Sequence, residues 1–140
     1  MQAETERPGL ADVMAVADFR AALRRFLRQS ERIARRSGLT PQRYSLLLMI
    51  KGSPDGREQS TVTELSERLQ LAQSTVTELV RRAEEAGLIA REQSQRDARV
   101  AHLRLTPEGE RRLMLSFTAL AKERNQLRDA VSHLEGGLTG

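Results

Sequence analysis

The segment REQSQRDARVAHLRLTPEGERR, residues 91–112, is the most informative part of this sequence. Its first seven residues, through Asp97, include no large apolar side chain. Apolar and polar residues then alternate over 100–105, which is the two-residue period of a β-strand with one buried face. Together with a first strand that begins at Ile89, this pattern predicts a β-hairpin over about 89–105. Its tip would carry two arginines, Arg96 and Arg99.

Two short helices are expected before this hairpin. Thr63 can cap the first helix, which has leucines on one face. After a break at Leu71-Ala72, a second helix is expected from about residue 73 to residue 86. Gly87 follows at the position where a glycine commonly ends a helix.

The second of these helices has a polar face opposite an apolar one. At about 100° per residue, Val76, Leu79, Val80 and Ala83 fall on one side. The other side carries hydroxyl, amide, carboxylate and guanidinium groups, which can hydrogen-bond to base edges. Its residues are Ser74, Thr77, Glu78 and Arg81, with Gln73, Thr75 and Arg82 at its margins. The alternative is an ordinary solvated surface, on which Glu78 and Arg81 pair with each other.

The N-terminal region, residues 12–51, is expected to form two helices. The first has apolar residues at helical spacing, beginning Val16, Phe19 and Leu23, with arginines on its other faces. Residues 17–51 hold nine Arg or Lys against two Asp or Glu, whereas residues 60–112 hold nine of each. The positive charge therefore belongs to the N-terminal region. Those arginines could bind an anionic effector, supply phosphate contacts or form a solvated face.

A long last helix is expected over about 107–135. Thr106 can cap it, and Pro107 suits its first turn. Its apolar residues step by four and three, which forms a heptad seam with one arginine, Arg124, in it. The seam consists of Leu113, Phe117, Leu120, Leu127, Val131 and Leu134. Such a seam needs a partner surface, which could be the first helix of this chain or the same seam of a second chain.

Two short helices at a sharp turn followed by a hairpin predict a winged helix-turn-helix over residues 60–106. The fold class is therefore mainly α with a small β-hairpin wing, and the 140 residues suit one domain. The second helix of such a motif fits the major groove, about 12 Å wide. The hairpin tip can contact the minor groove, whose negative potential attracts arginine.

The sequence resembles the MarR (multiple antibiotic resistance regulator) family of transcription factors. The resemblance runs from about Asp12 to Leu134 and is strongest in RDARVAHLRLTPEG, residues 96–109. It implies a homodimer, held by the terminal helices, that binds double-stranded DNA, and a ligand pocket between those helices and the DNA-binding lobe. The implied DNA-binding residues are Gln73, Ser74, Thr75, Thr77, Glu78, Arg81, Arg96, Asp97 and Arg99. The implied dimerisation residues are Val16, Phe19, Leu23, Leu113, Phe117, Leu120, Leu127, Val131 and Leu134.

The chain also departs from the family pattern. A separate last helix is usual in the family, whereas this chain is expected to end near Leu134 in a glycine-rich tail. Ala72 stands where a capping residue is common, and the lobe carries no net charge. Tyr44, the only tyrosine, is either at the edge of the core or a ligand contact.

Composition excludes several other classes. The chain has no cysteine, so thiolate metal sites and disulfides are ruled out. No apolar run approaches the ~18 residues of a membrane helix, and a cytoplasmic location is expected. We expect no catalytic site, no metal and no cofactor, because no nucleophile–base pair or phosphate loop is visible. Two rivals to DNA binding are a winged helix that binds protein and membrane-surface binding by the basic first helix.

Overall fold

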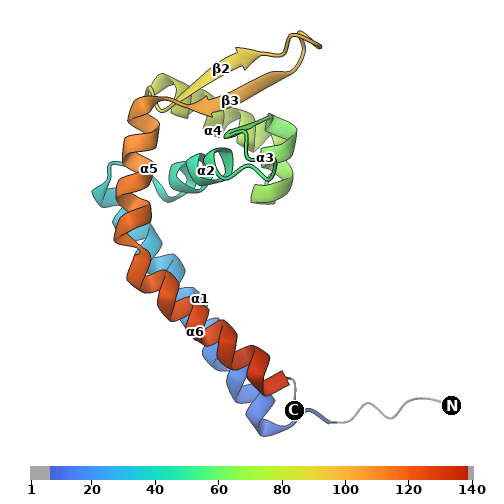
Figure 1. Ribbon diagram of the computed structural model, residues 1–140, viewed down its shortest axis with the longest axis vertical. Coiled ribbons are helices and arrows are strands. Elements are labelled where there is room, and N and C mark those ends of the chain that lie inside the picture. Colours follow the sequence, from blue (N-terminus) through green and yellow to red (C-terminus); the bar gives the residue numbers. More distant parts are fainter. Residues whose placement is uncertain (1–6, 139–140) are drawn as a thin grey trace, which may run out of the picture. The chain divides into compact units, whose positions relative to one another are not determined.

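The computed structural model describes residues 7–138, with side chains through Glu135. In chain order its elements are α1 (Leu10–Arg36), α2 (Pro41–Lys51), β1 (Gln59–Ser60), α3 (Val62–Leu69), α4 (Gln73–Glu85), β2 (Ile89–Gln93), β3 (Ala101–Leu105), α5 (Pro107–Ala119) and α6 (Ala121–Leu138) (Figure 1). The predicted class, mainly α with a hairpin wing, is confirmed.

The chain divides into two compact units. We call Glu31–Thr118 the winged unit, and Met1–Ser30 with Ala119–Gly140 the helical unit. The expected lobe of 60–106 is thus joined in the winged unit by α2, most of α5 and the end of α1.

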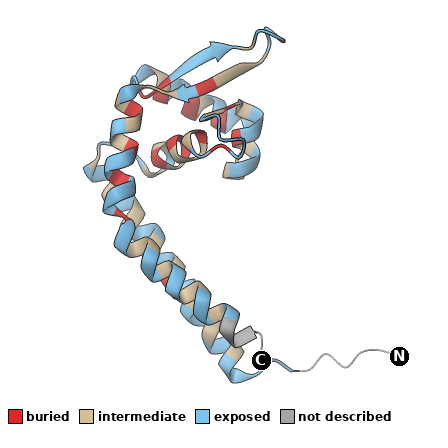
Figure 2. Cartoon of the chain, viewed as in Figure 1, coloured by how far each residue is buried: buried red, intermediate tan, exposed pale blue. Residues whose placement is uncertain are grey.

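The winged unit has a dense apolar core. Leu46, Leu47 and Ile50 of α2 have no exposed surface, and they pack against α3, α4 and β3. Figure 2 shows the buried residues gathered in these elements. α2 begins as predicted, because the Thr40 hydroxyl accepts a hydrogen bond from the main-chain N–H of Arg43 at 3.2 Å.

The helix-turn-helix differs from the sequence prediction at its first cap. Thr61, not Thr63, caps α3 through a reciprocal pair of hydrogen bonds with Glu64. The pair satisfies two N–H groups at once, whereas Thr63 lies inside the first turn of the helix. At the other end of α3, Gln70 adopts a left-handed conformation with φ 55°. This residue turns the chain into α4, as the predicted break required.

The wing is a three-stranded antiparallel sheet in the order β1-β3-β2. The predicted hairpin is confirmed, with Ile89 opposite Leu105 and Gln93 opposite Ala101. The sequence did not predict β1, because two residues carry no usable alternation. Ser60 of β1 pairs with Leu103, so the short strand closes the buried edge of β3.

The wing is joined to α5 by a close main-chain contact. Thr106 donates its hydroxyl to the carbonyl of Gly87 at 2.6 Å and accepts from the N–H of Gly109 at 3.1 Å. A Cβ added at Gly109 would lie 2.0 Å from the carbonyl oxygen of Leu88. Only glycine fits there without a shift of main chain, which explains the glycine of the LTPEG segment.

The long helix predicted over 107–135 is two helices. The α-helix is interrupted at Leu120, whose carbonyl accepts from the N–H of Arg124 at 2.9 Å and so begins α6. The expectation that the chain lacks a separate last helix is therefore wrong. Part of the expected glycine-rich tail also belongs to α6, which continues through Leu138. Residues 139–140 lie outside the described range.

The predicted dimerisation residues fall into two groups. Leu113 and Leu120 have no exposed surface, so each is buried within its own chain. Val16 and Phe117 are each 41% exposed. The remaining five are partly exposed: Phe19, Leu23, Leu127, Val131 and Leu134.

Candidate nucleic-acid interface

The polar face of α4 is exposed as predicted. Gln73, Ser74, Thr75 and Thr77 are all exposed, while the apolar side of the helix is buried in the winged unit. Gln73 donates its amide N–H to the hydroxyl of Thr63 at 3.4 Å, which joins α4 to α3. Ala72 precedes α4 and provides no side-chain cap. The first-turn N–H groups of α4 therefore have no such cap, and groups of this kind favour an anion.

Arg81 is held between two carboxylates on the same helix. Its Nε and Nη2 donate to both oxygens of Glu78, at 2.9 and 2.5 Å, and its Nη1 donates to Glu85 at 2.5 Å. Arg82 adds a bond to Glu78 at 3.1 Å. These arginines lower the pKa of Glu78 to about 2, and Glu78 raises the pKa of Arg81. The carboxylates therefore compete with any phosphate for Arg81.

The wing tip is organised around Asp97. Its Oδ1 accepts from the main-chain N–H of Arg99 at 3.0 Å and from the Arg99 Nε at 3.2 Å. These bonds lower the pKa of Asp97, the main-chain bond most strongly. The Ser94 hydroxyl accepts from the N–H of Arg96 at 3.2 Å. The Arg99 side chain is 91% exposed, so its guanidinium is fixed by Asp97 yet open to a partner.

Several contacts in this region were not predicted. Arg91 of β2 pairs with Glu84 of α4 at 2.8 Å, and Arg104 of β3 lies 4.0 Å from Glu92 of β2. These pairs join different elements or strands, so helical spacing does not reveal them. The pairs Arg81–Glu85 and Arg82–Glu78 have the four-residue spacing that could have predicted them. Together they explain how the lobe can be rich in arginine and carry no net charge.

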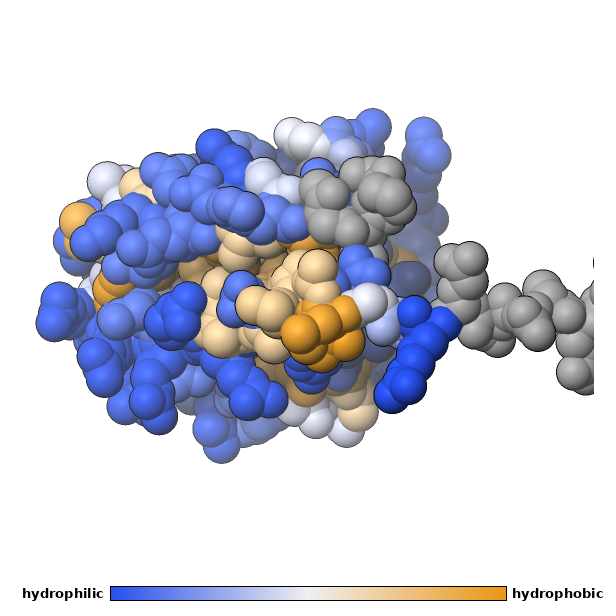
Figure 3. All heavy atoms as spheres, turned by 90° about the horizontal axis from the view of Figure 1, so that it is seen from below, coloured by the Kyte–Doolittle hydropathy of each residue, from blue (hydrophilic) through white to orange (hydrophobic). Residues whose placement is uncertain are grey.

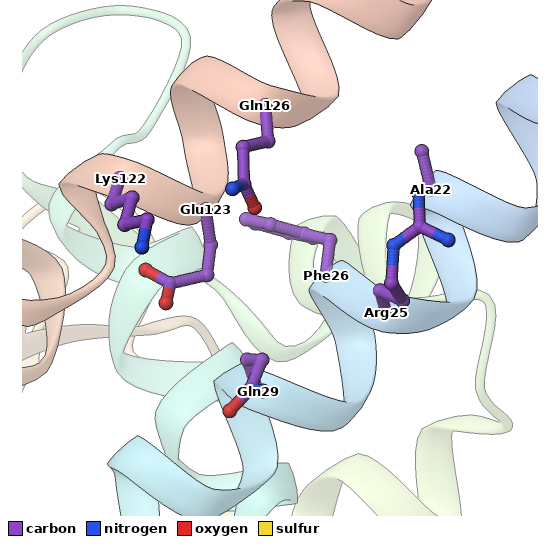
Figure 4. Close-up of a pocket in the computed structure, with 7 residues that line it drawn as sticks. All are labelled: Ala22, Arg25, Phe26, Gln29, Lys122, Glu123 and Gln126. Atoms are coloured by element: carbon purple, nitrogen blue, oxygen red, sulfur yellow. The ribbon is translucent and has the colours of Figure 1, made fainter.

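The other predicted site residue, Tyr44, lies in the core. It is 9% exposed, which leaves little surface for a ligand. A cavity of about 470 Å³ lies elsewhere, in the helical unit between α1 and α6 (Figure 4). Its lining includes Arg25, Phe26, Lys122 and Glu123, and Glu123 Oε2 is buried without a hydrogen-bond partner among the described residues.

Among residues 7–138, no three His, Asp or Glu side chains come together as a metal site would require. In the same range, no helix combines the length and the apolar character needed to cross a membrane.

Comparison with known proteins identifies the fold. AbsC of Streptomyces coelicolor, a MarR family transcriptional regulator, superposes with a TM-score of 0.69 at 21% identity, over 89% of this chain and 84% of that one. Sco3205 of the same organism, in complex with DNA, gives 0.66 at 24% identity, over 89% and 78%. A mutant MarR from E. coli complexed with operator DNA gives 0.69 at 18% identity, over 86% and 87%.

Sequence comparison matches a shorter part of the chain. No curated protein matches the chain. Residues 37–100, which run from the end of α1 through the wing tip, match the family model described as MarR family. The chain therefore has the fold of these MarR family regulators, and its winged helix-turn-helix matches the family model.

Proposed function

We propose that this protein is a sequence-specific DNA-binding transcriptional regulator without catalytic activity that acts in the cytoplasm. The exposed polar face of α4 carries the proposal, because it ends beside a wing whose tip presents Arg96 and Arg99. α4 would enter the major groove and the wing tip the minor groove. The solved relatives bound to DNA have the same fold, which supports this placement.

Different groups of α4 would contact bases and phosphates. Thr77 and Gln73 carry an exposed hydroxyl and an exposed amide, which are suited to base edges. The free first-turn N–H groups suit a phosphate. Arg81 would contact DNA only by leaving Glu78 or Glu85, so its contribution depends on displacing a carboxylate.

A second copy of the chain is part of the proposal. Among the described residues of the helical unit, only Ala22 and Leu120 are buried apolar residues. Leu10, Val13, Met14 and Val16 on the first half of α1 are exposed, at 41–75%. Figure 3 shows an apolar area framed by hydrophilic residues. Two helices with so little core need a partner, and a second copy would cover this face and present two α4 helices to a pseudo-palindrome.

The proposal also includes a small effector that binds to the protein. The cavity in the helical unit supports it, because cationic, anionic and aromatic side chains converge there around an unpaired oxygen of Glu123. A polar compound bound there would change how the two copies associate. The distance between their α4 helices would then change.

The experiment is fluorescence anisotropy with labelled genomic fragments over a range of salt. Affinity should fall steeply with salt, because phosphate contacts release counterions. Arg99→Ala should weaken binding to all fragments roughly 5- to 150-fold, the range for a lost contact of this kind. Changes at Thr77 should alter the preference among fragments more than the affinity. Identical effects of both changes on every fragment would contradict the assigned roles.

A protein-binding winged helix is the second candidate. The pairing of Arg81, Arg82 and Arg91 with carboxylates favours it, because it removes the net positive field usual for a DNA-binding surface. If no fragment changes anisotropy at low salt and micromolar protein, this candidate replaces the first.

A further inference from the structure

No arginine of α1 has an acidic partner among the described residues, whereas several arginines between α4 and α5 do. Arg81, Arg91, Arg99 and Arg111 each pair with a carboxylate. None of the seven α1 arginines takes part in an ion pair or a side-chain hydrogen bond with another described residue. All seven are exposed: Arg20, Arg24, Arg25, Arg28, Arg32, Arg35 and Arg36.

Three of them form a regular row within the helical unit, which we call the arginine ridge: Arg20, Arg24 and Arg28. A spacing of four residues advances about 6 Å along a helix and turns its surface by only about 40°. The three guanidinium groups therefore leave one side of α1 over a length of about 12 Å. Asp18 lies two residues before Arg20 and Glu31 three residues after Arg28, and no ion pair among the described residues joins either carboxylate to the ridge.

We infer that the arginine ridge is a second phosphate-binding surface, which takes the backbone of a nucleic acid independently of α4 and the wing. A duplex carries one negative charge per about 1.7 Å of its axis. A row of cations that lies along the edge of a groove therefore contacts several phosphates. Arginine suits this partner, because its planar guanidinium donates two parallel hydrogen bonds to phosphate oxygens. The three guanidinium groups have no carboxylate partner, so a phosphate can bind them without displacing one. Arg81, by contrast, must first leave Glu78 or Glu85.

An anionic membrane is the less favoured partner. Surface binding by an amphipathic helix needs an apolar face that can enter the headgroup region. Phe19, Leu23 and Phe26 of α1 are partly buried within the chain, and Phe26 lines the cavity between α1 and α6 (Figure 4). The charge of the ridge is thus available to a partner, while among the large apolar side chains of the same helix segment only Leu27 is exposed.

The test uses the full chain and a labelled short duplex of random sequence, titrated at several salt concentrations. The ridge variant is Arg20→Gln, Arg24→Gln and Arg28→Gln together, since glutamine keeps a high helix propensity. A matched control removes three positive charges elsewhere in the helical unit: Arg7→Gln, Lys122→Gln and Arg128→Gln. A lobe variant, Arg96→Gln with Arg99→Gln, weakens the proposed DNA-binding function instead.

The ridge variant should lower the slope of log affinity against log salt by about 2.7, which corresponds to three phosphates. The matched control should change the slope much less, and ridge binding should persist in the lobe variant. If the ridge variant and the control change the slope equally, or if the ridge variant does not change it, the inference is overturned. If the ridge variant keeps duplex binding but loses binding to vesicles containing phosphatidylserine, the partner is a membrane and the inference fails.

The outcomes also separate this inference from the proposed function. Loss of binding in the lobe variant alone supports α4 and the wing and refutes the ridge. Loss in the ridge variant alone supports the ridge and counts against the lobe as the main phosphate-binding surface. Circular dichroism of each variant verifies that the helices are intact.

Discussion

Replacing Gly109 by alanine should destabilise the protein, although glycine-to-alanine changes in helices normally stabilise by roughly 0.4–1 kcal/mol. The residue is buried in the first turn of α5. Its new Cβ would lie 2.0 Å from the carbonyl oxygen of Leu88 and 3.0 Å from the carbonyl carbon. Ordinary contact begins near 3.4 Å, so α5 and residue 88 must separate by more than an ångström.

The separation would have to move main-chain atoms, because main chain cannot relieve an overlap by changing rotamer as a side chain can. The Leu88 carbonyl accepts from the N–H of Thr106 at 3.0 Å, and a shift would weaken this bond, worth about 1 kcal/mol. Overpacking of this kind costs about 1–3 kcal/mol more. The expected loss is therefore about 2–4 kcal/mol, which lowers Tm by roughly 8–16 °C for a chain of this size.

Urea unfolding followed by circular dichroism measures the loss. Gly56→Ala is the matched control, because Gly56 has φ +74° and nothing within 4 Å of a new Cβ. Gly56→Ala introduces backbone strain but no steric overlap, and it should lower the free energy of unfolding by about 1–2 kcal/mol. If Gly109→Ala is as stable as the original chain, or more stable, the close contact between α5 and the wing does not exist as described.

Three further changes test the electrostatics and the caps. Glu85→Gln removes one carboxylate from Arg81, so anisotropy titrations should show a salt slope steeper by about 0.9 per α4 helix; an unchanged slope contradicts the competition between Glu85 and phosphate. The pKa of Glu108 lies at about 2, lowered by Arg111 and Arg112, so its stabilising contribution is present above its ordinary value of 4.5 and is lost as pH falls toward 2. Glu108→Gln should therefore flatten that part of the pH dependence of the free energy of unfolding, measured with urea at a series of pH values, and an unaltered profile would show that the pairs do not form. Thr61→Ala removes the capping box of α3 and should lower the free energy of unfolding by about 1 kcal/mol, with no loss as the contrary result.

Much of the winged unit could be predicted because its patterns are long and regular. The alternation through Leu103 and the polar face of α4 identified the hairpin and the second helix with nearly correct bounds. The cap of α3 was misplaced by two residues, because both Thr61 and Thr63 are capping residue types. β1 was missed because two residues give no period.

The helical unit was harder to predict. The heptad steps continue across Leu120, and neither glycine nor proline marks the interruption between α5 and α6. The sequence also could not tell that Leu113 would be buried within the chain. Ion pairs between elements, such as Arg91 with Glu84, depend on tertiary packing and have no sequence spacing to reveal them.

The proposed function requires that two copies of this chain bind one pseudo-palindromic duplex through α4 and the wing. Selection of bound sequences from a random duplex library by the purified protein tests it most directly. We expect enrichment of an inverted repeat whose half-sites lie about 10–10.5 base pairs apart, centre to centre. Arg96→Gln with Arg99→Gln should abolish the enrichment. A pool that stays random at low salt, with the protein folded, would contradict the claim.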